Sequence, residues 1–136
     1  MGGAVRITAD TNVLVRVLVQ DDPDQARAAM DLLSWAELVA VPLPVLCELV
    51  WALRRVYGFA AADSLDAIEA LLAARTVVTD RPAVRAGLRL LAGGGDFADA
   101  VIAFSGRRLG GERFVSFDRR AVQLLADLGE PAELLE

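Results

Sequence analysis

Five acidic residues stand where a carboxylate could take part in chemistry. Asp10 and Asp118 each directly follow a short apolar run, as residues at the end of a strand would. Asp96 and Asp99 come after a run of glycines and lie three residues apart, so they share one face of the first turn of a predicted helix. Glu48 falls inside an otherwise apolar helical pattern, where an unpaired charge is costly to bury. Such carboxylates favour metal-assisted acid–base chemistry.

The composition excludes most other catalytic groups. The 136 residues contain 14 arginines, 19 acidic residues and a single cysteine, but no histidine and no lysine. Without histidine no Ser-His-Asp or Cys-His relay can form, and without lysine there is no Walker phosphate loop and no Schiff base. Cys47 alone cannot build a zinc site from cysteine and histidine ligands. If the chain is an enzyme, we therefore expect it to combine carboxylates with a hard cation.

Short apolar runs alternate with longer segments of helical period, a pattern typical of a parallel α/β sheet. The strands are predicted at residues 5–9, 38–41, 76–79 and 113–116, with a short fifth strand at the sheet edge at 132–135. The helices are predicted at residues 12–19, 22–36, 44–57, 61–74, 82–92, 97–109 and 119–128. With no linker and no repeat to divide the chain, residues 1–136 are expected to form a single domain.

The predicted topology brings the candidate carboxylates to one place. Right-handed crossovers put the carboxyl ends of parallel strands at one edge, where ligands bind. Asp10 and Asp118 both belong to that edge, and so does Asp80, which we interpret as a helix cap. A purely structural alternative stays open, because all the aspartates could cap helices and Glu48 could pair with a nearby arginine.

Carboxylates gathered at one crevice would need a counter-charge. Like charges in close contact raise one another's pKa, and a divalent cation removes that problem. Sites made only of oxygen ligands suit Mg²⁺ or Mn²⁺. Such an ion lowers the pKa of a water and orients a phosphodiester, and two ions about 3.5–4 Å apart can share these tasks. The expected reaction is therefore hydrolysis of a phosphodiester.

Four segments, taken in order, resemble the motifs of PIN-domain nucleases. They are residues 7–14 (ITADTNVL), Glu48, residues 96–103 (DFADAVIA) and residues 116–119 (SFDR). Their spacing and the chain length are similar to those of the toxin component of VapBC toxin–antitoxin pairs. The resemblance covers essentially the whole chain and implies a three-layer α/β/α fold with a short-stranded, mostly parallel central sheet. It also implies an Mg²⁺- or Mn²⁺-dependent endoribonuclease, with transfer or ribosomal RNA as candidate substrates, and a VapB-type antitoxin whose C-terminal segment wraps the toxin.

The resemblance assigns roles to individual residues. The acidic quartet of the family is matched by Asp10, Glu48, Asp99 and Asp118. Of these, Asp10 and Asp99 are expected to bind the metal directly, whereas the other two bind through water or help to deprotonate the attacking water. Asn12 matches a polar residue that holds the first aspartate, and Ser116 matches a hydroxyl residue that is more often threonine. Asp96 matches an accessory acid that only some members have.

The net charge of −5 argues mildly against a nucleic-acid partner, but the charge is unevenly distributed. Residues 105–120 contain five arginines against two acids, a net charge of +3, whereas the chain from residue 121 onward carries −4. The five are candidate contacts to an RNA backbone: Arg107, Arg108, Arg113, Arg119 and Arg120. The alternative is that these side chains are solvated or pair with nearby acids.

Apolar side chains suggest a protein partner. Trp35 and Trp51, together with Val50, Leu53 and Tyr57, exceed what one helix face needs for a small core. They either pack in the core or, as the resemblance favours, form an antitoxin groove and a homodimer face. No apolar run reaches the roughly 18 residues of a membrane span, and residues 1–6 lack the layout of a signal peptide. We therefore expect no membrane contact and a cytoplasmic location.

Two other functional classes remain open. One is a non-catalytic α/β module that only binds proteins and whose acids merely cap helices. The other is a carboxylate–metal phosphatase that acts on small phosphate esters. Against the phosphatase, Asp10 is followed by Thr11 and Asn12, so the first strand is not followed by an Asp-x-Asp nucleophile motif.

Overall fold

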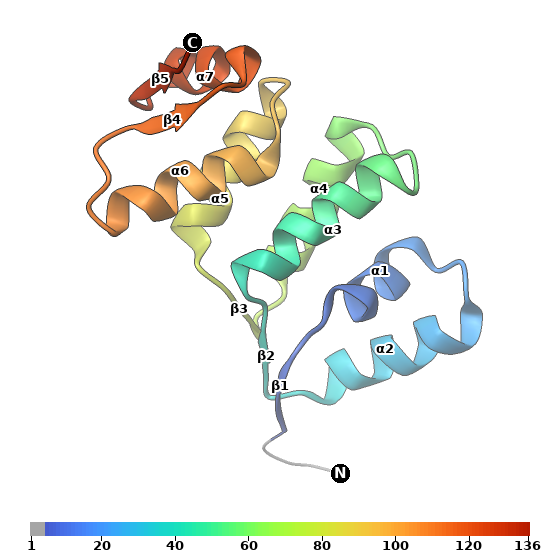
Figure 1. Cartoon of the computed structure of the whole chain (residues 1–136). Helices are drawn as coiled ribbons and strands as arrows, with labels where there is room; N and C mark the ends of the chain where they lie inside the picture. The colour runs from blue at the N-terminus through green and yellow to red at the C-terminus, as the bar shows by residue number, and fades with distance from the viewer. Residues whose placement is uncertain (1–4) are drawn as a thin grey trace. The chain divides into compact units, whose positions relative to one another are not determined.

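The computed structural model describes residues 5–136 and divides them into two compact units (Figure 1). The N-terminal unit extends to Asp80, and the C-terminal unit runs from Arg81 to Glu136. Residues 1–4, which belong to the segment examined for a signal peptide, lie outside the described residues. The expectation of a single domain over residues 1–136 stays a prediction.

Three parallel strands form the sheet of the N-terminal unit. β1 (Arg6–Thr8) pairs with β2 (Leu38–Ala40), which in turn pairs with β3 (Val77–Val78). The register aligns Ile7 with Val39, and Val39 with Val77. Parallel neighbours require long crossovers, and helices supply them here.

Four helices make the two crossovers: α1 (Thr11–Val19), α2 (Pro23–Trp35), α3 (Leu43–Arg55) and α4 (Ala61–Ala73). In α2, Asp22 caps the first turn and Pro23 opens it, as expected for a residue whose missing N–H costs no helical hydrogen bond. In α3, Leu46, Leu49 and Leu53 recur at helical spacing and are fully buried. These leucines contribute to the core of the unit.

The C-terminal unit contains three helices and two strands among its described residues. They are α5 (Arg81–Ala92), α6 (Phe97–Arg108), β4 (Phe114–Ser116), α7 (Arg119–Asp127) and β5 (Ala132–Leu134). β4 and β5 are parallel, and Val115 aligns with Glu133. A small core of Leu90, Ala100, Ala103 and Leu125 lies between the elements.

Close packing of α5 on α6 depends on glycine. A Cβ atom added to Gly87 would lie 2.6 Å from the ring of Phe97, which is itself almost fully buried. The turn between the two helices contains Gly94, whose positive φ of 94° is easily adopted only without a side chain. This tight turn leads directly into Asp96 at the start of α6.

The predicted α/β class with short parallel strands is confirmed. Each predicted helix and strand is present, including the fifth strand, and the bounds differ by one or two residues. The third strand is one residue shorter at each end than predicted, and just beyond it Thr79 Oγ1 donates to the Val41 carbonyl at 2.7 Å. Within the described residues the pairing forms two ladders, β1-β2-β3 and β4-β5.

The two tryptophans are not core residues. Trp35 is 63% exposed and Trp51 is 59% exposed, whereas Val50 and Leu53 are buried. Core packing, one of the two interpretations of this apolar group, is therefore wrong for the tryptophans and correct for the two aliphatic residues. No helix among residues 5–136 is long and apolar enough to cross a membrane.

Candidate functional site

In the N-terminal unit, Asp10 stands directly after Ala9 at the end of β1 and caps α1. Its backbone is extended, and its Oδ1 accepts a hydrogen bond of 2.8 Å from the Thr11 N–H. The first turn of a helix presents unpaired N–H groups and a positive dipole end, so it stabilises a carboxylate there. The capping interpretation is therefore correct for Asp10, but the cap engages only Oδ1. Within the described residues, no hydrogen bond engages Oδ2.

Thr11 connects Asp10 to the second acid of this unit. Its Oγ1 donates to Glu48 Oε1 of α3 at 2.8 Å, across 37 positions of sequence. Glu48 is exposed, so the expectation that it is buried among apolar neighbours is wrong. No arginine among residues 5–136 forms an ion pair with Glu48, so the alternative of an arginine partner is also not observed. The Thr11 hydroxyl is the partner of the Glu48 carboxylate instead.

Sequence reasoning missed Thr11 and selected its neighbour Asn12. Asn12 is exposed, and the described part of the chain shows no hydrogen bond between its side chain and Asp10. The role predicted for Asn12 stays a prediction. A single sequence carries no signal for Thr11, because a hydroxyl at the first position of a helix is common and its partner lies far away along the chain.

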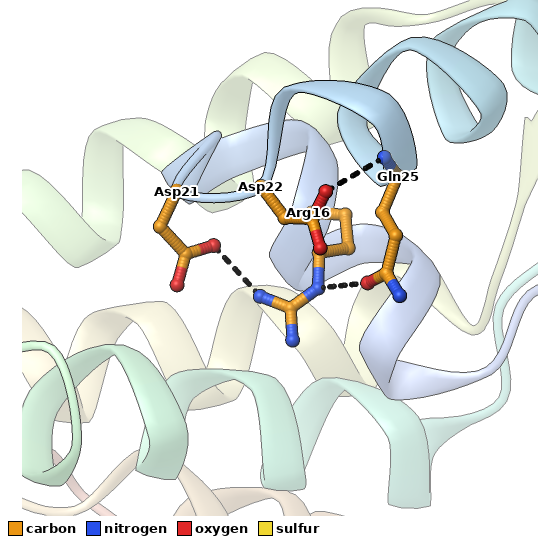
Figure 2. Close-up of polar contacts among 4 residues, drawn as sticks. All are labelled: Arg16, Asp21, Asp22 and Gln25. Atoms are coloured by element: carbon orange, nitrogen blue, oxygen red, sulfur yellow. Dashed lines mark hydrogen bonds and ion pairs between the residues drawn. The ribbon is translucent and has the colours of Figure 1, made fainter.

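A second polar cluster holds the other end of α1 (Figure 2). Arg16 Nη1 contacts Asp21 Oδ1 at 2.7 Å, and Arg16 Nε donates to Gln25 Oε1 at 2.7 Å. A side-chain hydrogen bond with Tyr57, just beyond α3, raises the pKa of Arg16, and the Asp21 carboxylate adds to this shift. Thr11 thus joins the start of α1 to α3, whereas Arg16, in the last turn of α1, contacts Asp21 and Gln25 of the following segment. These contacts position Asp10 and Glu48 relative to each other.

In the C-terminal unit, two aspartates cap neighbouring helices. Asp96 Oδ1 accepts from the Ala98 N–H at 3.2 Å at the start of α6, and Asp118 Oδ1 accepts from the Ala121 N–H at 3.1 Å at the start of α7. The capping interpretation is thus correct for both. As with Asp10, each cap leaves Oδ2 without a hydrogen bond within the described residues.

Asp99 lies one turn into α6 and is the most perturbed acid of the site. Partial burial raises its pKa, and the negative charges of Asp96 and Asp118 raise it further. No hydrogen bond within the described residues stabilises the charged form of Asp99. Asp96 and Asp118 therefore each repel the negative charge of Asp99.

Backbone contacts hold Asp118 beside the start of α6. Ser116 Oγ accepts from the Asp118 N–H at 3.0 Å, so the predicted hydroxyl residue does contact this acid, through its backbone. Arg120 Nη2 donates to the Gly94 carbonyl at 2.8 Å and so links the first turn of α7 to the turn that precedes Asp96. The predicted site residues are thereby brought together in two sets, one in each unit.

The oxygen donors of the candidate site residues fit a hard cation. All are carboxylate or hydroxyl oxygens, which suit Mg²⁺ or Mn²⁺, and a cation would relieve the repulsion that raises the pKa of Asp99. Within residues 5–136, no group of three histidine, cysteine, aspartate or glutamate side chains forms a ready metal site. The oxygens available within each unit would therefore have to be completed by water or by donors from elsewhere.

The five candidate RNA-contacting arginines divide between two ends of the C-terminal unit. Arg119 and Arg120 directly follow Asp118, whereas Arg107 and Arg108 lie in the last turn of α6, about 12 Å along the helix from Asp99. Arg113 precedes β4 and so lies at the end of that strand remote from Asp118. The Arg108 guanidinium stacks 4.5 Å from the centre of the Phe104 ring, and both line an open hollow with Arg107.

The alternative of pairing with nearby acids is correct for three of these arginines. Arg107 contacts Glu130, Arg113 contacts Glu133, and Arg119 contacts Glu136. The first N···O distance is 3.0 Å, the second 3.2 Å and the third 3.8 Å. Each of the three arginine side chains is more than half exposed, so a phosphate could reach it and compete with the glutamate.

Comparison with known families gives one result. The PIN domain family matches residues 7–126, a range that spans both units and includes every predicted site residue. No curated protein matches the chain. The matched range contains the Asp10 and Glu48 set as well as the set around Asp99. The chain therefore belongs to the PIN domain family.

Proposed function

We propose that this chain is a metal-dependent endoribonuclease and the toxin component of a type II toxin–antitoxin pair. PIN domains are generally metal-dependent nucleases. The observation that carries the proposal is the PIN-family match over residues 7–126, which includes the carboxylates of Asp10, Glu48, Asp99 and Asp118. The raised pKa of Asp99, caused by its partial burial and by the repelling carboxylates of Asp96 and Asp118, adds to it. A protein keeps such repulsion at functional sites more often than elsewhere, and a divalent cation compensates it.

In this proposal the acids of both units take part in the reaction, as the acidic quartet of the PIN family implies. Asp10 and Glu48 of the N-terminal unit work with Asp99 and Asp118 of the C-terminal unit, so that residues 1–136 function as a single PIN domain. Two facts support this: the family match spans both units, and the caps leave carboxylate oxygens available in each. The absence of histidine and lysine leaves no other strong base for the reaction.

Each residue has a role in hydrolysis. Asp10 and Asp99 would hold Mg²⁺ or Mn²⁺, which when bound lowers the pKa of water and stabilises the leaving oxygen. Glu48 accepts the proton of the water whose oxygen attacks phosphorus, while the phosphorus–oxygen ester bond breaks and its oxygen leaves with a proton from solvent. Asp118 orients that water. Thr11 holds the Glu48 carboxylate through the 2.8 Å hydrogen bond.

The remaining candidates support this machinery. Ser116 holds the backbone of Asp118, and Asp96 adds negative charge beside Asp99. Asn12 is proposed to steady Asp10 when RNA or a cation is bound. The arginines nearest Asp118, Arg119 and Arg120, are the first proposed contacts to the RNA backbone, ahead of Arg107, Arg108 and Arg113.

A cleavage assay on purified protein tests the proposal. Asp10→Asn should abolish Mn²⁺-dependent cleavage of RNA while leaving the circular dichroism spectrum unchanged. Asp24→Asn is the matched control, because Asp24 is also an exposed aspartate in the first turn of a helix and belongs to neither acidic set. Full activity of Asp10→Asn would contradict the proposal, and cleavage of a chromogenic phosphate ester instead of RNA would support a phosphatase.

The toxin role has its own test. The exposed Trp35 and Trp51 support a surface for a VapB-type antitoxin or a homodimer partner in the cytoplasm. Induced expression in a bacterial host should arrest growth, and Asp10→Asn should remove the arrest. Co-expression with the short reading frame next to the gene should restore growth. Growth arrest by the Asp10→Asn variant as well would separate the toxicity from nuclease activity.

A further inference from the structure

Three glutamates near the end of the chain form ion pairs with three of the candidate RNA-binding arginines. Glu130, Glu133 and Glu136 come at intervals of three residues, and each forms an ion pair with an arginine of the same unit. We call the three pairs the arginine–glutamate row. The whole row lies within the C-terminal unit.

The row follows β5 from one end to the other. Glu133 lies within β5, whereas Glu130 precedes the strand and Glu136 follows it. Glu130 and Glu136 each lie two residues beyond an end of β5. Because Arg119 comes directly after Asp118, the row begins next to the proposed catalytic acids and leads away from them.

The pairs of the row are weak enough to be exchanged. Both side chains of the Arg113–Glu133 pair are about half exposed, and those of the Arg119–Glu136 pair are more exposed still. Exposed ion pairs contribute little to stability and are screened by salt. An RNA phosphate offers the same guanidinium a charge-assisted contact and releases counterions when it binds. Glutamate and phosphate therefore compete for the same donors.

Glu130 differs from the other two glutamates. Its side chain is only 20% exposed, and its Oε2 is buried with no hydrogen-bond partner in the described structure. This glutamate is held by the fold, so its substitution would disturb packing as well as charge. The exchangeable members of the row are thus Glu133 and Glu136.

We propose that Glu133 and Glu136 compete with the RNA backbone for the arginines of the arginine–glutamate row and thereby set the affinity of the chain for RNA. This inference rests on the proposed function, because it takes RNA as the ligand of the arginines. RNA binds along the row only as the glutamates release Arg113 and Arg119. Removal of either negative charge consequently tightens RNA binding beyond the effect of net charge alone.

A matched pair of variants tests this inference. Glu133→Gln and Glu112→Gln remove the same charge, but Glu112, next to Arg113 in sequence, forms no ion pair among residues 5–136. Binding of a fluorescein-labelled single-stranded RNA is measured in an Asp10→Asn background, so that no cleavage occurs. Glu133→Gln should tighten binding about threefold at low salt, and Glu112→Gln should change it by much less. The logarithmic salt dependence should steepen by about one unit only for Glu133→Gln.

A double-mutant cycle identifies the contact responsible. In an Arg113→Gln background, Glu133→Gln should have no larger effect than Glu112→Gln, because the competed donor is gone. If Glu133→Gln fails to fold, the pair Glu136→Gln and Arg119→Gln serves in the same cycle. Equal effects of the paired and unpaired glutamates would overturn the inference, and so would the absence of RNA binding in every variant. Paired effects without RNA cleavage by the unmutated protein would support the inference and contradict only the nuclease proposal.

Discussion

The two units hold their acids in different ways. In the N-terminal unit, Asp10 and Glu48 are linked through Thr11, so a neutral hydroxyl bonds to one carboxylate and the adjoining N–H to the other. In the C-terminal unit, no hydrogen bond to the Asp99 side chain is found among residues 5–136, and partial burial together with the charges of Asp96 and Asp118 raises the pKa of Asp99. The first set is positioned by hydrogen bonds and the second is held together by the fold against repulsion. Cation dependence should therefore be strongest in the C-terminal set.

The largest expected effect comes from the repelling set. Asp99→Asn should lower RNA cleavage by about a thousandfold, comparable to the loss of a group that stabilises charge in the transition state. Asp96→Asn should cost about tenfold, because Asp96 adds charge but is already engaged as a helix cap. Single-turnover cleavage at saturating Mn²⁺ measures both. Equal losses for the two variants would mean that both aspartates bind the cation alike.

The hydrogen-bonded set should respond to Thr11. Thr11→Val keeps the shape of the side chain but removes the hydroxyl that donates to Glu48, so we expect a 10- to 100-fold loss of kcat. Thr11→Ser restores the donor and should recover most of the activity. A loss shared equally by the serine and valine variants would contradict this account, because the serine variant keeps the hydroxyl donor and lacks only the methyl group.

A smaller effect is expected at the far end of α1. Arg16→Met keeps the aliphatic stem but removes the contacts to Asp21, Gln25 and Tyr57, which tie α1 to its neighbours. We expect a few-fold loss of cleavage and a lower unfolding temperature, because Asp10 is positioned less firmly. Asp31→Asn is a suitable control for surface changes on α2. Wild-type cleavage by Arg16→Met would show that the Thr11 contact alone positions the N-terminal set.

The smallest effect concerns the stability of the metal-free protein. The raised pKa of Asp99 means that the folded state binds its proton more tightly than the unfolded state does. Its contribution to stability is therefore present at pH values below about 3.9, the usual pKa of aspartate, and is lost as the pH rises through the higher folded pKa. Asp99→Asn should raise the unfolding temperature in EDTA at pH 7 by no more than a few degrees, since Asp99 is partly exposed.

Thermal unfolding monitored by circular dichroism from pH 3 to pH 8 checks this sign. The difference in unfolding temperature between Asp99→Asn and the unmutated protein should disappear toward the acid end of this pH range. Added Mn²⁺ should raise the unfolding temperature of the unmutated protein by mass action and leave that of Asp99→Asn nearly unchanged. A lower unfolding temperature for Asp99→Asn in EDTA would show that the charge of Asp99 stabilises the fold.

The helices and strands were predictable because their signals are local. The apolar spacing of α3 and the cap and proline at the start of α2 identify these helices without reference to the rest of the chain. Glu48 is exposed although its neighbours in sequence are apolar. Apolar neighbours in sequence do not share its face, since residues one or two apart on a helix point in different directions.

Residue types and their order along the chain predict a chemistry of carboxylates and a hard cation, and the resemblance to PIN-domain nucleases nominates Asp10, Glu48, Asp99 and Asp118 among the 19 acids. The partners of these acids depend on the folded chain. Thr11 reaches Glu48 across 37 positions, Asp118 adds to the raised pKa of Asp99, and Glu133 occupies Arg113. Spacing along a sequence defines helix faces and strand ends, but only packing brings distant side chains within the few ångströms over which hydrogen bonds and charges act.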